Sequence, residues 1–161
     1  MVFNTGAALL DAIVLAVVSK EPEGTYGYKI TQDVRGVLDI SESTLYPVLR
    51  RLQKERGITY LFIAHDLSVM RYISDRIAVI HKGDIVELAD AEELVTHAIH
   101  PYTRSLLSAI PLPNPVVEKR RVAETYDYAS SGIDYNKGTD HLVSGSHYVK
   151  CTDEEFAKWC R

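Results

Sequence analysis

The chain has 161 residues and a net charge of −4 at pH 7, and 46% of its residues are hydrophobic and 25% charged. These values are ordinary for a globular protein of one domain or two very small ones, and the acidic balance gives no whole-chain case for binding nucleic acid or an anionic membrane. The longest apolar stretch, residues 7–18, is interrupted by Asp11 and is too short to span a bilayer. It also lacks the basic start and cleavage site of a signal peptide, so we expect a cytoplasmic protein.

The first part of the chain predicts two helices. Residues 7–19 carry apolar side chains almost all round, which indicates a mostly buried helix. Within residues 28–38, Ile30, Val34 and Leu38 recur every four positions, which indicates an amphipathic helix.

A third helix is expected over residues 41–55, where Ser41 or Ser43 can cap the first turn by accepting a backbone N–H. Its apolar stripe comprises Leu45, Val48, Leu49 and Leu52. Three helices with a short turn before the third fit a helix-turn-helix, whose third helix would enter the major groove of DNA. Its polar face carries Glu42, Thr44, Tyr46, Arg50, Arg51 and Lys54. Arginine and lysine can contact phosphates, and serine, threonine and tyrosine can contact phosphates or base edges. A plain amphipathic helix with a solvated basic end is the alternative.

The spacing of apolar residues changes in the middle of the chain, from a helical pattern to a strand pattern. Residues 58–65, ITYLFIAH, are nearly all apolar and rich in β-branched and aromatic residues, which favours a strand buried on both faces. Residues 66–75 have helical spacing, residues 76–80 predict a second strand, and residues 85–89 predict its hairpin partner after a tight HKGD turn. The first three of these elements would form one right-handed strand–helix–strand crossover.

The last third predicts little regular structure. Residues 90–110 indicate two short helices divided at His100-Pro101, and residues 111–115 a stiff extended linker. From Val116 onward Tyr, Ser, Gly and Asp occur without periodicity, so we expect an irregular extension with one short helix in DEEFAKWC.

The cysteines and histidines do not predict a metal site. Cys151 and Cys160 have C-x8-C spacing without a second pair, so two reduced thiols are expected. The histidine at 81 precedes a turn and is expected to be solvated, and His97, His100, His141 and His147 lack ligand spacing.

Two strings of the N-terminal part resemble the PadR family of transcriptional regulators. They are YGYKI at 26–30 and DISESTLYPVLRRLQKE at 39–55, and the resemblance covers about residues 3–55. It implies a winged-helix DNA-binding dimer with contacts near Ser43, Thr44, Tyr46 and Arg50. The family pattern continues into a two-stranded wing and a long dimerisation helix, which this sequence does not show, so we expect few phosphate contacts and weak DNA binding.

The remainder resembles a different family. GITYLFIAHDLSVMRYISDRIAVIHKGDIVE at 57–87 resembles the end of an ABC-transporter ATPase domain, and HPYTRSLLSAIPLPNP at 100–115 narrows this to the ATPases of oligopeptide and dipeptide importers. The resemblance runs from about residue 53 to at least 151. It implies that His65 is a switch histidine that contacts the γ-phosphate of ATP, that ATP and magnesium are the ligands of the full-length family, and that importer subunits at the cytoplasmic face of the membrane are its partners.

The rest of a nucleotide site has no counterpart in this sequence. There is no G-x-x-x-x-G-K-[ST] loop, no L-S-G-G-Q signature, and no apolar strand ending in Asp-Glu before His65. Phosphoryl transfer needs a backbone cradle, a lysine and carboxylates for magnesium and water. We therefore expect His65 to be without function here, no bound cofactor and no hydrolysis of ATP by this chain.

The sequence thus predicts a chimera with an α+β fold. A PadR-like helix-turn-helix at 1–55 precedes a truncated α/β ATPase remnant with a small β-α-β-β sheet at 56–99 and an irregular extension at 100–161. The expected function is a fragment of an importer ATP-binding subunit joined to a DNA-binding segment. The expected DNA contacts of that segment are Ser43, Thr44, Tyr46, Arg50, Arg51 and Lys54. The alternatives are a PadR-like DNA-binding regulator and a non-functional fusion product. An unpaired edge on the strand at 58–64 also predicts self-association.

Overall fold

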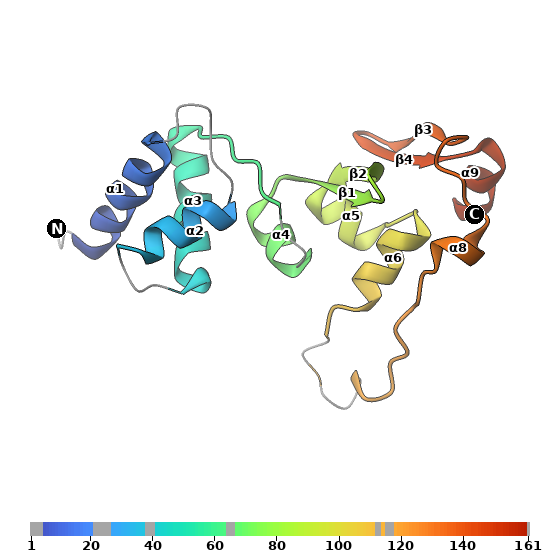
Figure 1. Cartoon of the computed structure of the whole chain (residues 1–161), viewed down its shortest axis with the longest axis horizontal. Helices are drawn as coiled ribbons and strands as arrows, with labels where there is room; N and C mark the ends of the chain where they lie inside the picture. Colours follow the sequence, from blue (N-terminus) through green and yellow to red (C-terminus); the bar gives the residue numbers. More distant parts are fainter. Residues whose placement is uncertain are drawn as a thin grey trace. The chain divides into compact units, whose positions relative to one another are not determined.

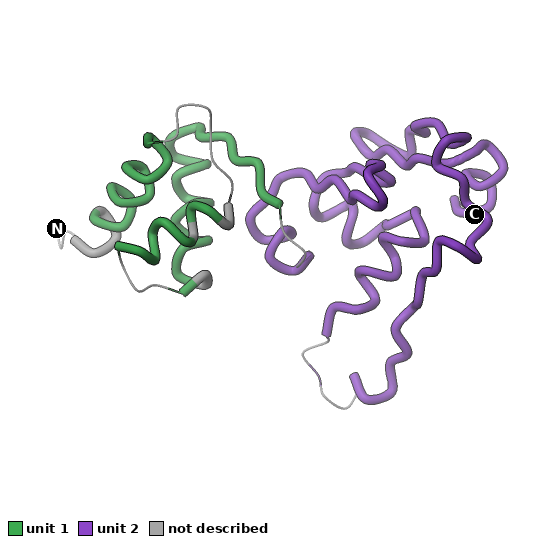
Figure 2. Tube along the Cα trace, in the orientation of Figure 1, with its two compact units in different colours: residues 1–66 green, residues 67–161 purple. Residues whose placement is uncertain are grey.

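The structure is a computed structural model that describes residues 5–20, 27–37, 41–63, 67–111, 114 and 118–160. It divides into two compact units, residues 1–66 and residues 67–161 (Figure 2). Within the described ranges, no helix combines the length and the apolar character needed to cross a membrane.

Unit 1 is helical in its described part (Figure 1). Helix α1 spans Thr5–Ser19, α2 spans Gly27–Arg35 and α3 spans Glu42–Arg56, which confirms the three predicted helices. Ser41 occupies the N-cap of α3 with an extended backbone, although its side chain makes no capping bond. Gly57 ends α3 in the left-handed region, at φ 65°, where a glycine is favoured.

Apolar side chains of all three helices form the core of unit 1, although α1 is less buried than predicted, since Leu9 is 56% exposed. Helix α1 packs against both α2 and α3. The side chains buried between these helices are Leu10, Val14, Val17, Ile30, Val34, Leu45, Val48, Leu49 and Leu52. Asp11 of α1 and Arg51 of α3 form an ion pair across the same interface. Leu38, which the sequence assigned to the second stripe, lies outside the described residues.

The predicted strand at 58–65 is wrong for the part that is described. Residues 58–63 form no strand, and among the described residues they make no backbone–backbone hydrogen bond. Leu61 is 76% exposed and Ile63 is 73% exposed. A strand needs a neighbour to pair with, and the described secondary-structure elements of unit 1 are all helices. The predicted strand–helix–strand crossover is therefore wrong as well.

Unit 2 begins with the predicted helix and hairpin. Helix α4 spans Leu67–Ile73, strand β1 spans Arg76–His81 and strand β2 spans Asp84–Asp90. The turn places Lys82 at φ 52° and Gly83 at φ 92°, the positive values that a tight two-residue hairpin turn requires. The hairpin prediction is confirmed.

The predicted irregular extension is wrong, because the C-terminal residues add two strands to the hairpin. Strand β3 spans Thr139–Ser144 and β4 spans His147–Cys151. The described strands form one antiparallel sheet in the order β1-β2-β4-β3. Polar side chains on the solvent face hide the alternation in this segment, whereas the inward residues His147, Val149 and Cys151 are buried.

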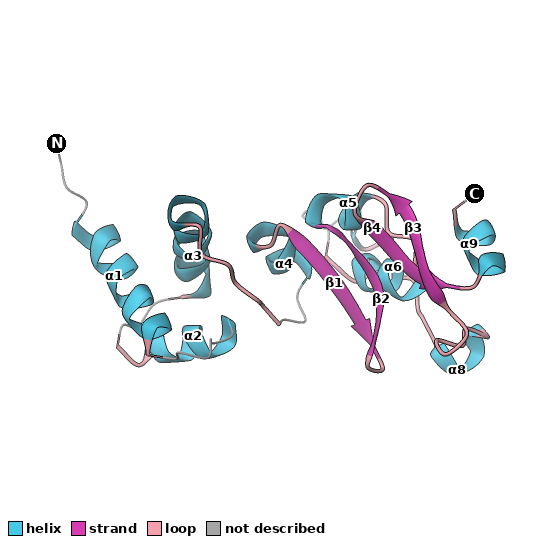
Figure 3. Ribbon diagram, turned by 90° about the horizontal axis from the view of Figure 1, so that it is seen from above, coloured by secondary structure: helices cyan, strands magenta, loops and turns pink. Residues whose placement is uncertain are grey.

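Four further helices complete unit 2 in its described part. Helix α5 spans Ala91–Thr96, α6 spans Pro101–Ser108, α8 spans Tyr128–Ser131 and α9 spans Asp153–Trp159. These confirm the two short helices around His100-Pro101 and the helix in DEEFAKWC. Helices α5 and α6 lie on one face of the sheet, and Figure 3 views the other face, which no described helix covers.

The uncovered face of the sheet carries an apolar row. The strand registers place Ala78 opposite Leu88, Leu88 opposite Tyr148, and Tyr148 opposite Leu142, so the row crosses all of the described strands. Leu142 is 55% exposed and Tyr148 39% exposed. The opposite face holds the core of unit 2 and, at its centre, a cluster of polar side chains.

Candidate functional site

The residues predicted as sites fall into two groups. The predicted switch residue, His65, lies outside the described residues. The predicted DNA contacts all lie on α3, where Thr44 and Lys54 are exposed and Arg51 is half-buried in its ion pair with Asp11. The backbone of Ser43 is helical, and its side chain lies outside the described part. Tyr46 and Arg50 each interact with other residues of the chain.

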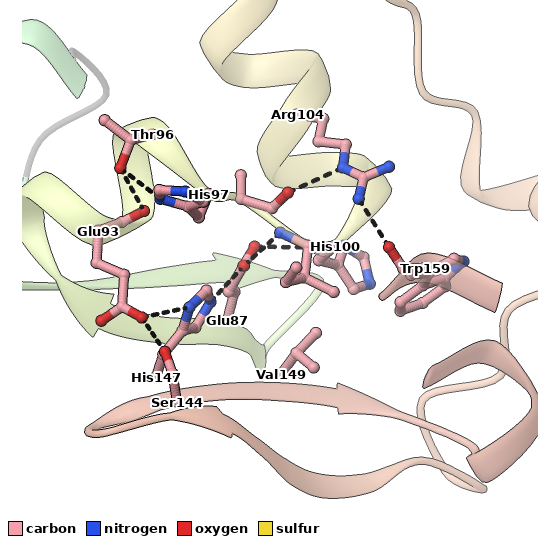
Figure 4. Close-up of polar contacts among 12 residues, drawn as sticks. Glu87, Glu93, Thr96, His97, His100, Arg104, Ser144, His147, Val149 and Trp159 are labelled. Carbon is pink, nitrogen blue, oxygen red and sulfur yellow. Dashed lines mark hydrogen bonds and ion pairs between the residues drawn. The ribbon is translucent and has the colours of Figure 1, made fainter. Parts of the chain in front are cut away.

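The most developed polar site belongs to unit 2 and centres on Glu87 (Figure 4). This residue of β2 is 1% exposed. Its carboxylate accepts the backbone N–H of Ile99 at 2.7 Å, the backbone N–H of His100 at 3.1 Å, and a bond with Nε2 of His147 at 2.8 Å. Burying a carboxylate is tolerated only when hydrogen bonds replace its water, and these three described donors do so.

A β-bulge turns Glu87 inward. Strict alternation along IVELA would place Val86 and Leu88 on the core face and Glu87 on the solvent face. In the structure Val79 pairs with Glu87 and Ile80 pairs with Ile85, which leaves Val86 as the extra residue of β2. The extra residue shifts the alternation, so that both Val86 and Glu87 are buried.

His147 lies between two carboxylates. Its ring is fully buried, with Nε2 on Glu87 and Nδ1 3.4 Å from Oε1 of Glu93. The second contact does not have hydrogen-bond geometry. Glu93, from α5, instead accepts the hydroxyl of Ser144, and this bond holds the pKa of Glu93 below its usual value, with a smaller contribution in the same direction from His147.

His100 begins helix α6 and is buried. Its Nδ1 accepts the backbone N–H of Tyr102 at 3.1 Å, Pro101 follows at the first helical position, and its ring packs edge-on against Trp159 at 5.3 Å. Burial, with a smaller effect of His81, lowers the pKa of His100 to about 4, so the ring is neutral at pH 7. The His100-Pro101-Tyr102 motif therefore acts as a helix cap and packing element.

The expectation that His81 is solvated is wrong. Its Nδ1 lies 2.7 Å from the hydroxyl of Tyr135, and its ring lies 4.2 Å from the ring of Tyr102. Tyr126 and Tyr128 complete an aromatic cluster around it. Burial, with a smaller effect of the Lys82 charge, lowers the pKa of His81.

The last helix is tied to the same region through Arg104 of α6. Its Nε donates to the carbonyl of Ala98 at 2.9 Å, and one of its terminal nitrogens donates to the carbonyl of Trp159 at 3.2 Å. Cys151 is buried and Cys160 is exposed, and both are free thiols. Burial raises the pKa of Cys151 to about 12, which makes that thiol unreactive at neutral pH.

The sequence predictions did not identify Glu87, Glu93 and His147 as a site. A lone glutamate within IVELA is a weak signal for a buried carboxylate, since a solvent-facing position explains it equally well. The Gly145-Ser146 pair between HLVS and HYVKC is the pattern that would have indicated the hairpin carrying His147. In the part of the chain that is described, no group of three or more His, Cys, Asp or Glu side chains is arranged to hold a metal ion.

Two protein families match separate parts of the chain. The transcriptional regulator PadR-like family matches residues 14–61, and the C-terminal region of oligopeptide/dipeptide transporters matches residues 86–133. The chain therefore carries a PadR-like region followed by an oligopeptide transporter C-terminal region, as its sequence motifs predicted.

Several curated proteins are similar to the larger part of the chain. The oligopeptide transport ATP-binding protein AmiF of Streptococcus pneumoniae is 45% identical over 133 residues, which are 82% of this chain and 43% of that protein. OppF of Bacillus subtilis is 46% identical over 129 residues, 79% of this chain and 42% of its own length. The dipeptide transport ATP-binding protein DppF of Lactococcus lactis is 39% identical over 129 residues, 80% and 41% of the two chains. The chain thus spans less than half the length of these relatives.

The two similarities overlap on α3. The match to AmiF spans 133 of the 161 residues, so it includes Glu42–Arg56 wherever in the chain it begins. The same residues lie inside the PadR-like match. Helix α3 is therefore similar to both groups of proteins.

We expect Glu87→Ala to destabilise unit 2 by about 3 kcal/mol or more, because it leaves two backbone N–H groups and the His147 ring buried without their acceptor. The shift in the urea midpoint of the unit 2 transition measures this. The matched control is Glu92→Ala, which removes a surface ion pair with Arg71 whose glutamate side chain is 69% exposed and should cost at most about 1 kcal/mol. Equal effects of the two substitutions would contradict the structural role of Glu87.

Proposed function

We propose that residues 56–161 are the C-terminal part of an ATP-binding subunit of an oligopeptide or dipeptide importer, and that this chain does not hydrolyse ATP by itself. The observation that carries the first half is the 45% identity to an oligopeptide transport ATP-binding protein over 133 residues. The partners implied are the other subunits of such an importer. If the chain does not associate with importer subunits, the alternative is a fusion product without activity.

The second half of the proposal rests on the chemistry of phosphoryl transfer. The sequence contains no phosphate-binding G-x-x-x-x-G-K-[ST] loop and no Asp-Glu strand end before His65. A single histidine cannot replace the backbone cradle, the lysine and the magnesium carboxylates, since each stabilises a different part of the transferred charge. His65 therefore marks the similarity to ATPases without supplying their activity.

We expect MgATP to leave the melting temperature of the purified protein unchanged, because a ligand stabilises a protein only through a site on its folded state. ATP turnover should stay at background in both the wild type and His65→Ala. Turnover by the wild type that is lost in His65→Ala would overturn the proposal, since contamination would persist in the variant.

A second candidate function, DNA binding by α3, is favoured by the PadR-like match at 14–61. Thr44 and Lys54 are exposed on this helix and are the side chains best placed for phosphate contact. The ion pair of Arg51 with Asp11 competes with any phosphate for that guanidinium. Tyr46 and Arg50 would contribute from the same helix, with Ser43 at its start.

If α3 binds DNA, Lys54→Ala should weaken binding to a short mixed-sequence duplex and reduce the salt dependence by about one counterion. A mobility-shift titration across a salt series measures both. Lys158→Ala removes the same charge from an exposed position on α9 and serves as the control. Absence of any shift at low salt would end this candidate.

We also propose that the chain self-associates, through exposed apolar side chains and not through an unpaired strand edge. Leu61 and Ile63 expose most of their apolar surface. The double substitution Leu61→Lys and Ile63→Lys should reduce the oligomeric fraction in light scattering, because it replaces that surface with charge. Val122→Lys changes a residue that is 89% exposed and should have no such effect. A monomeric wild type would refute the proposal.

A further inference from the structure

The uncovered face of the unit 2 sheet has an apolar centre (Figure 3). Its middle row contains one residue from each described strand, in the order Ala78, Leu88, Tyr148 and Leu142. Beside this row Ile80 and Ile85 lie opposite each other on β1 and β2, and they are 61% and 51% exposed. A contiguous exposed apolar patch marks an interaction surface, whereas scattered apolar side chains do not.

Charged side chains flank this apolar centre at two opposite corners of the face. At one end Arg76 on β1 lies opposite Asp90 on β2, and at the other end Asp140 on β3 lies opposite Lys150 on β4. Each corner therefore carries both signs of charge. A partner that is strongly acidic or strongly basic does not match this pattern, because it would be repelled at one residue of each corner.

The outermost charges at these corners are those of Arg76 and Asp140. Lys150 forms an ion pair with Asp84. The guanidinium of Arg76 donates one bond to a backbone carbonyl, at 3.3 Å, and a guanidinium has further donors to offer. Asp140 is exposed and forms no ion pair within the described part of the chain. A cation placed over Asp140 and an anion placed over Arg76 would complete both corners.

A second copy of the same face supplies both charges. Neighbouring strands are about 4.8 Å apart and alternate residues of a strand about 6.7 Å apart, so the face is nearly square, about 14 Å across the strands and about 13 Å along them. A two-fold axis that runs diagonally between the other two corners exchanges the Arg76 and Asp140 corners. The strands of the two sheets then cross at near right angles, which is one of the two usual ways in which sheets pack.

We propose that unit 2 forms a dimer by packing this sheet face against the same face of a second copy, with Arg76 of each copy on Asp140 of the other. The two apolar centres cover each other and leave water, which is the favourable contribution to the free energy of association. In a two-fold contact each favourable pair occurs twice. The interface is separate from the exposed Leu61 and Ile63, and it does not depend on the proposed importer function.

Sedimentation velocity of the full chain carrying Leu61→Lys and Ile63→Lys tests this dimer apart from the association proposed for those two side chains. The sheet face is unchanged in this double variant, so we expect a monomer–dimer equilibrium at micromolar concentrations. A double variant that stays monomeric up to millimolar concentration would overturn the sheet-face dimer, whatever the wild type does.

Substitutions on the face locate the contact. In the same double variant, Leu142→Asp and Ile80→Asp should each weaken the dimer about tenfold or more, because each places a carboxylate where the dimer excludes water. Both side chains are exposed on the outer strands of the sheet, so the urea midpoint of unit 2 should change little. Val122→Asp adds the same charge outside the sheet, at a residue that is 89% exposed, and should have no effect. Equal dimer affinity in all of these variants would contradict the proposal.

A charge exchange tests whether the occupant is a second copy in this orientation. Arg76→Glu and Asp140→Arg should each weaken the dimer about tenfold, because each brings like charges together at both symmetry-related contacts. Mixing the two variants should restore association, since in the mixed dimer each substituted position faces a charge of opposite sign. A mixture that associates no better than either variant alone would overturn the pairing of two copies across this face.

Discussion

The buried carboxylate of Glu87 is the constraint on which the packing of unit 2 depends. Burying this carboxylate to 1% exposure would cost much free energy if hydrogen-bond donors did not replace the water that it loses. Two of its donors are backbone groups of the loop that precedes α6, and the third is the imidazole of His147 on β4. One side chain therefore fixes a strand, a loop and a hairpin that are far apart in the sequence, and the same requirement forbids these segments from moving separately.

The cap of α6 and the position of the His147 ring both follow from this constraint. Because Glu87 holds the backbone of His100, the His100 ring is directed into the interior, where it caps α6 and packs against Trp159. Because Glu87 also holds His147 by Nε2, the other ring nitrogen faces Glu93. The contact between His147 and Glu93 is thus a consequence of how the core is satisfied.

Helix α3 illustrates why similarity to two families can coincide on one segment. Its apolar side chains Leu45, Val48, Leu49 and Leu52 recur at helical spacing and are buried against α1 and α2. A leucine stripe followed by a charged end suits any helix that packs on one side, so a helix-turn-helix and an ATPase can both use it. The buried stripe therefore identifies a packed helix, and only the exposed side chains distinguish a DNA reader from a structural helix.

The sequence by itself determined the elements whose signals are local. An apolar run predicted α1, helical spacing predicted α2 and α3 with their apolar stripes, turn residues predicted the β1–β2 hairpin, and the family motifs predicted both matched regions. The tertiary structure decided what depends on partners distant in the chain. Residues 58–63 are apolar enough for a strand but have no described neighbour to pair with, whereas the polar segment at 139–151 becomes sheet because β2 offers it an edge. The inward turn of Glu87 likewise requires a bulge that no period in the sequence reveals, since pairing energy belongs to the contact between strands and not to either strand alone.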